Sequence, residues 1–195
     1  MVVRKVFRIW TCALLLVALA GCAAKRGAAA TFHDENMDFS LLRTVAVLPF
    51  ANLTATQTAG ERVRDVFATM LQATGSLYVL PPGEVGKGIA RTNPATATAP
   101  SAEEVVAFAK AVGADAVLTG IVLEYGEARS GSASANYVSI GVKMMEAKTG
   151  KVVWSASSTR GGVGAAERLF GGGGKPMNEV TARAVEDLLD QLFAK

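Results

Sequence analysis

Four glycines followed by a lysine, residues 171–175, are the stretch whose residue types first suggest chemistry. Backbone N–H groups of such a run can cradle a phosphate while the lysine ammonium completes the site. A phosphate loop also needs a glycine five places before Gly174 and a serine or threonine after the lysine, where this chain has Leu169 and Pro176. We therefore interpret the stretch as a surface loop, and keep the hypothesis that Leu169 and Phe170 form an apolar hook facing a partner.

The side chains that usually carry catalysis or bind metals are sparse. His33 is the single histidine, so a zinc site would lack its usual ligands, and we expect His33 to be a solvated residue of a tether. The acid pairs Glu103/Glu104 and Glu186/Asp187 are adjacent in sequence. Neighbouring helical residues point to different sides, which favours capping or solvation over paired catalysis. The sequence thus predicts a non-enzymatic protein with no metal and no cofactor.

A polar loop after the first apolar run holds the candidate binding residues Asn52, Thr54 and Thr56. The loop precedes an expected helix, and ligands of open α/β sheets bind where strands end and helices begin. A partner or ligand loop is therefore one interpretation of these residues. The other interpretation is that they make local turns within the loop.

The first 21 residues have the pattern of an export signal. Arg4, Lys5 and Arg8 precede an apolar stretch from Ile9 to Ala20, which is too short for a spanning helix of roughly 20 apolar residues. The whole chain has 20 Lys and Arg against 17 Asp and Glu, and removal of the signal leaves 17 of each sign. A near-neutral chain without a basic run does not favour a nucleic-acid partner.

The end of the signal and the residue after it are Leu19-Ala20-Gly21-Cys22, which resembles the lipobox of bacterial lipoproteins. The resemblance implies cleavage between Gly21 and Cys22 and a lipid, such as palmitate, attached through Cys22. Two or three acyl chains anchor a protein stably to a membrane. Ala23 after the cysteine resembles a signal for the outer membrane, so we expect a lipid-anchored protein that faces the periplasm.

The remaining chain reads as a tether and one domain. Residues 22–40 show no helical or strand period, and 41–195 alternate strands and helices before a late hairpin. The expected fold class is α/β, a single domain whose mixed sheet has an antiparallel hairpin in its C-terminal half, with helices packed on it. We expect strands at 44–48, 77–80, 116–125, 137–147 and 151–159, helices at 58–74, 81–91, 101–112 and from Asn178 onward, and loops at 92–100, 126–135 and 161–174.

The helix starts carry their own signals. Thr58–Glu61 and Ser101–Glu104 have the pattern of a capping box, and Asn178 is the expected cap of the last helix. The expected inner face of that helix is Val180, Ala184, Val185, Leu188, Leu189, Leu192 and Phe193.

Three of these segments resemble the CsgG/LpoB-like envelope lipoproteins: Val45–Thr54, Val112–Gly120 and the hairpin Glu146–Ser155. The resemblance implies a non-enzymatic domain that binds protein partners or assembles with copies of itself. We accordingly expect an accessory or assembly factor in secretion, transport or peptidoglycan synthesis. The alternative is an envelope lipoprotein that binds a small ligand or glycan through the loop of Asn52, Thr54 and Thr56.

Overall fold

Strand β2 (Thr44–Val47) is the apolar run that the sequence predicts to be covered on both faces. Val45 and Ala46 both have no exposed surface, although they point to opposite faces of the sheet. Val45 belongs to a large apolar cluster on one face, and Ala46 belongs to a smaller cluster on the other. Alternation of side chains along the strand therefore fills two cores at once.

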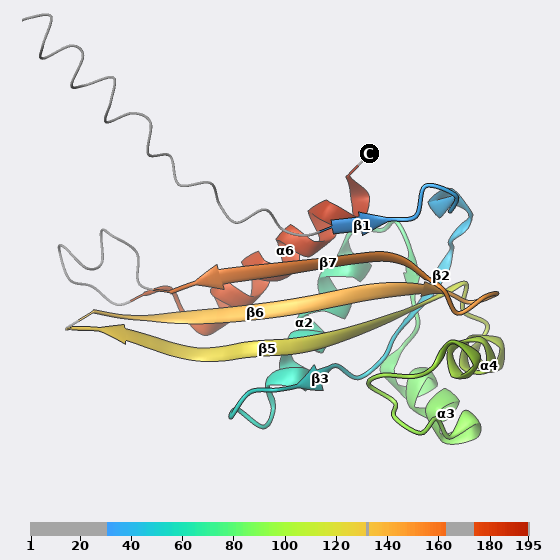
Figure 1. The fold of residues 1–195 in the computed structure, drawn as a ribbon, viewed down its shortest axis with the longest axis horizontal. Helices are drawn as coiled ribbons and strands as arrows, with labels where there is room; N and C mark the ends of the chain where they lie inside the picture. Colours follow the sequence, from blue (N-terminus) through green and yellow to red (C-terminus); the bar gives the residue numbers. More distant parts are fainter. Residues whose placement is uncertain (1–30, 132, 163–173, 195) are drawn as a thin grey trace, which may run out of the picture.

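The computed structural model describes residues 31–131, 133–162 and 174–194, which build one seven-stranded mixed sheet (Figure 1). The strand order is β1-β7-β6-β5-β2-β4, and β3 pairs with β5. Strands β2, β3, β4 and β5 are parallel, whereas β5, β6, β7 and β1 pair antiparallel. The expected α/β fold with a mixed sheet is confirmed. The further strands are β1 (Thr31–His33), β3 (Ala51–Asn52), β4 (Tyr78–Val79), β5 (Ala116–Ser130), β6 (Ala133–Glu146) and β7 (Val152–Gly161).

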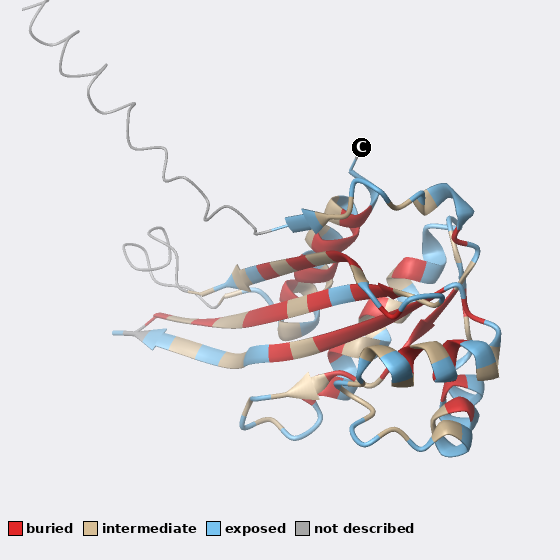
Figure 2. Ribbon diagram, turned by 45° about the vertical axis from the view of Figure 1, so that its right-hand side comes forward, coloured by how far each residue is buried: buried red, intermediate tan, exposed pale blue. Residues whose placement is uncertain are grey.

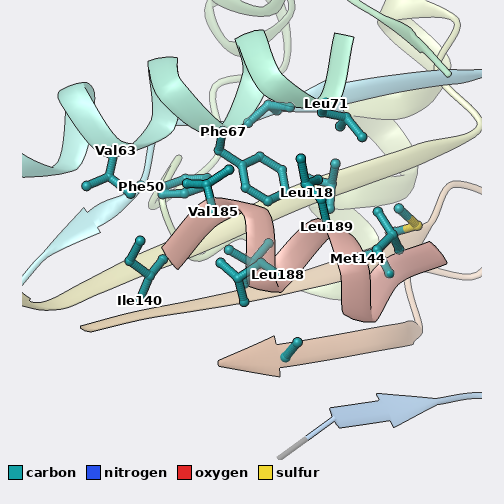
Figure 3. Close-up of a cluster of buried hydrophobic side chains, with 14 of the residues drawn as sticks. Phe50, Val63, Phe67, Leu71, Leu118, Ile140, Met144, Val185, Leu188 and Leu189 are labelled. Carbon is teal, nitrogen blue, oxygen red and sulfur yellow. The ribbon is translucent and has the colours of Figure 1, made fainter. Parts of the chain in front are cut away.

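Helices α2 (Ala59–Ala73) and α6 (Met177–Phe193) pack on one face of the sheet, and Figure 3 shows the core between them. The rings of Phe50 and Phe67 lie 5.8 Å apart there. Helices α3 (Pro82–Thr92) and α4 (Ala102–Val112) lie on the opposite face against β2 and β5. That face is only partly covered, since Lys143 of β6 is exposed and Ser155 of β7 is half-buried.

The helix ends agree with the sequence in part. Ser101 and Glu104 form the expected capping box of α4, and Gly113 ends the helix at a φ of 72°. The capping box expected at Thr58 is wrong, because its side chain makes no capping hydrogen bond. Helix α6 begins after Pro176, so Asn178 does not cap it.

The expected inner face of α6 is buried at every position except Phe193, which is 41% exposed at the helix end.

The loop expected at 126–135 is wrong. Strands β5 and β6 stay paired as far as Ser130 and Ala133, so the hairpin extends past the helices (Figure 1). The pairing uses backbone groups that every residue type except proline carries, and residues 126–135 contain no proline. Figure 2 shows that the far part of β5 is mostly exposed or half-buried.

The expected tether also ends earlier than residue 40. Thr31–His33 form β1 against β7, and a short 3-10 helix follows at Phe39–Leu41. His33 is half-buried rather than solvated, because its Nε2 lies 2.9 Å from the carbonyl oxygen of Gln191 and its ring contacts Phe39 and Trp154. A three-residue strand is too short to produce a visible sequence period, which explains the error.

Gly21, Cys22, Leu169 and Phe170 lie outside the described residues, so the expected lipid site and apolar hook stay predictions. Within the described ranges, no helix combines the length and the apolar character needed to cross a membrane.

Candidate functional site

The loop between β3 and α2 is held together by the side chain of Asn52. Its amide nitrogen donates to the carbonyl oxygens of Thr56 and Gln57, at 2.9 and 3.1 Å. Its amide oxygen accepts from the backbone N–H and the hydroxyl of Thr54, at 3.0 and 2.8 Å. An amide offers two donors and two acceptor positions, and all four are used inside the loop.

Asn52, Thr54 and Thr56 are therefore brought together, and the Thr54 hydroxyl also accepts from the backbone N–H of Thr56 at 3.2 Å. This network matches the interpretation of local turns. Since Asn52 has no spare hydrogen-bonding capacity, its visible role is to fix the shape of the loop. Ligand or partner binding by these three polar side chains stays a prediction.

The fixed loop presents an apolar side chain to solvent. Leu53 is 66% exposed, and its backbone N–H donates to the carbonyl oxygen of Val122 at 3.0 Å. The next residue of β5, Leu123, is 44% exposed and lies where the pairing of β5 with β6 shifts register. A bulge of this kind re-aims side chains at a sheet edge. Two exposed leucines thus share one edge of the sheet.

The edge continues along β5 beyond the bulge. Between Glu124 and Ser130, no described strand pairs with the outer side of β5. Leu53, Leu123 and residues 124–130 together are called the β5 edge surface below. An open edge offers backbone donors and acceptors to another chain, and charged side chains limit indiscriminate pairing. Glu127 and Arg129 supply such charges and form an ion pair at 3.1 Å.

Each acid pair singled out in the sequence has at least one member that forms hydrogen bonds within the fold. Arg160 of β7 donates two hydrogen bonds to the carboxylate of Asp187, which also accepts from the Ser158 hydroxyl at 2.7 Å. The bonded carboxylate raises the pKa of Arg160 above its usual value. This contact ties α6 to the sheet.

Glu104 caps α4, and no cluster of three or more His, Cys, Asp or Glu in the described ranges is placed to hold a metal ion.

Comparisons with known proteins agree with this architecture. The model of the family described as "Putative lipoprotein GNA1162-like" matches residues 36–191. A solved structure of a PelC variant from Paraburkholderia phytofirmans, a dodecamer, is 22% identical with a TM-score of 0.58, covering 86% of this chain and all of that one. GNA1162 from Neisseria meningitidis is 19% identical with a TM-score of 0.56, covering 78% of this chain and 99% of that one. None of the curated proteins compared with this chain matches it significantly.

At these identities the two structures establish likeness of fold alone. The family match confirms the lipoprotein part of the resemblance noted in the sequence, and the family it names is GNA1162-like rather than specifically CsgG-like.

Proposed function

The chain belongs to the GNA1162-like family of lipoproteins, and we propose that it is a lipid-anchored accessory or assembly factor of the bacterial envelope that acts through protein contacts. Lipid on Cys22 would hold it to the outer membrane, with the domain in the periplasm. Its partner would be an envelope protein or a second copy of the chain. The proposed role is non-enzymatic, in secretion, transport or peptidoglycan synthesis.

The β5 edge surface is the observation that carries this proposal. It joins two exposed leucines to a strand edge that no described strand covers. Apolar side chains beside open backbone groups suit a partner that adds a strand and buries the leucines. The dodecameric state of PelC supports a second copy as one such partner.

A photoreactive amino acid at Glu127 would test this surface in intact cells that make the full chain. We expect adducts above the mass of one chain after illumination, and an adduct of twice that mass would identify a second copy. Exposed apolar residues at the centre of an interface carry most of its binding energy. The double variant Leu53→Ser, Leu123→Ser should therefore lower adduct yield about tenfold.

Leu41→Ser is the matched control, because Leu41 is 67% exposed on a different element. Its adduct yield should equal that of the unchanged chain. The proposed contact surface would be disproved if the unchanged chain gave no adduct from Glu127. It would also be disproved if the double variant and Leu41→Ser gave equal adduct yields.

A further inference from the structure

A groove of about 390 Å³ lies on the partly covered face of the sheet, opposite α2 and α6. Its floor is formed by β5, β6 and β7, and Thr98 and Ala99 of the loop between α3 and α4 line it as well. The volume falls in the range of small-molecule sites, roughly 300–1,000 Å³.

The strand register arranges the floor in two rows. Thr119, Lys143 and Ser155 are direct neighbours across β5, β6 and β7 and form the first row. Ile121, Gly141 and Ser157 form the second row, one pleat further along. Side chains of paired residues lie about 5 Å apart on the same face of a sheet. The first row therefore places a hydroxyl residue on each side of a lysine, and the second row adds the apolar side chain of Ile121.

Thr119 is the informative residue of the first row. It is 1% exposed, and its hydroxyl has no hydrogen-bond partner among the described residues. A buried hydroxyl without a partner destabilises the folded state, so native proteins keep few of them. An apolar residue of the same shape would suit the site better unless a ligand uses the hydroxyl.

The charge of the groove indicates the class of ligand. Lys143 is exposed and forms no ion pair with any described residue, and no acidic side chain lines the groove. An ammonium group without an acidic partner, on a groove floor that also carries the hydroxyls of Thr119 and Ser155, favours an oxyanion. Gly141 keeps the second row shallow, since a Cβ there would lie 3.3 Å from the side chain of Ile121. An apolar group can therefore rest on Ile121.

We propose that this groove binds a small amphiphilic carboxylate. The carboxylate accepts hydrogen bonds from Thr119 and Lys143, and the apolar body lies on Ile121 against the wall formed by Ala99. This binding site is separate from the β5 edge surface and does not depend on the proposed protein contacts.

An octanoate analogue carrying a diazirine tests the site on the full chain in lipid nanodiscs. We expect saturable labelling of peptides from β5, β6 and β7, competed by octanoate and about tenfold less effectively by octanol. Lys143→Met and Thr119→Val should each weaken labelling about tenfold. Lys148→Met is the matched control, because Lys148 is exposed outside the groove and should leave labelling unchanged.

Thermal unfolding supplies a second measurement. Thr119→Val should raise the Tm of the unliganded chain, because it removes a hydroxyl that has no partner. A lowered Tm would overturn the proposal, since it would mean that the hydroxyl is already satisfied inside the protein. Labelling that does not saturate, that maps to other elements, or that is equal in Lys143→Met and Lys148→Met would overturn it as well.

Discussion

An asparagine such as Asn52 can bind a ligand or fix the conformation of a loop, and the residues around it decide between these two roles. In the sequence it stands at the place where ligands of α/β sheets bind. In the fold its amide is saturated by Thr54, Thr56 and Gln57. The side chain of this loop that we propose to contact a partner is then Leu53, which the hydrogen-bond network holds exposed. A search for polar side chains alone would not identify it.

Gly60 keeps this loop and α2 close together. A Cβ at this position would lie 2.8 Å from the backbone oxygen of Phe50 and 3.3 Å from the Cβ of Asn52. Gly60→Ala should therefore lower the free energy of unfolding by about 1–3 kcal/mol through overpacking, although alanine favours helices by about 1 kcal/mol. Urea unfolding measures the change.

The matched control is Gly86→Ala, at an exposed position of α3, where a Cβ would meet nothing within 4 Å. This variant should gain up to about 1 kcal/mol from helix propensity. Equal effects of the two substitutions would contradict the close packing at Gly60.

At the scale of elements, Glu104 links the capping of α4 to the wall of the groove. Its carboxylate accepts from the backbone N–H groups of Ala95 and Ser101, each at 2.7 Å. Ala95 and Ser101 lie on either side of Thr98 and Ala99 in the sequence, so the two hydrogen bonds fix both ends of the segment that lines the groove. The same backbone hydrogen bonds lower the pKa of Glu104 below its usual 4.5.

A pKa lowered in the folded state gives stability that is present above the unfolded value and lost as pH falls through the folded value. We expect hydrogen exchange at Ala95 and Ser101 to quicken, after correction for intrinsic rates, as pH drops below about 4.5. Glu104→Gln should show the faster exchange already at pH 7. Glu61→Gln, at an exposed position in the first turn of α2, should leave exchange at both amides unchanged. Slow exchange in Glu104→Gln would refute the anchoring role.

Elements with a strong apolar period could be predicted from the sequence. The alternation of Val138, Ile140, Val142 and Met144 predicts β6, and all four side chains are buried. The Ser101–Glu104 capping box places the start of α4 correctly because it depends only on local hydrogen bonds. Local chemistry and periodicity are therefore sufficient where an element buries one face.

The missed features depend on partners distant in sequence. Strand β1 exists because His33 packs against Trp154 and Gln191, more than 100 residues away. The far half of the β5–β6 hairpin depends on backbone pairing between small residues, and in the sequence these residues predict a loop. In the sequence Thr119 is part of an apolar strand, and its place in the lining of a groove follows only from how much of the sheet α3 and α4 leave uncovered.

At the scale of the whole molecule, β1 changes the geometry of the proposed anchor. A tether reaching residue 40 would span up to about 60 Å from the lipid. The described fold begins at Thr31, nine residues after Cys22, which limits the separation to about 30 Å. Since His33 contacts Gln191 of α6, the β1 and α6 ends of the domain would both lie near the membrane, and the orientation of the β5 edge surface would be restricted.

A longer tether would distinguish the two proposed partners, a second copy of the chain and an envelope protein. Twenty Gly and Ser residues inserted after Ala24 add an average reach of roughly 25 Å. The lengthened chain should stay in the membrane fraction with an unchanged Tm, whereas Cys22→Ala should release the domain from lipid anchoring. Adducts from Glu127 between two copies should persist, because both copies carry the same tether. Adducts with an envelope protein held at a fixed depth should fall about tenfold. A lowered Tm would contradict the claim that the fold does not depend on the anchor. Loss of adducts between copies would contradict the claim that contacts of the β5 edge surface do not depend on it.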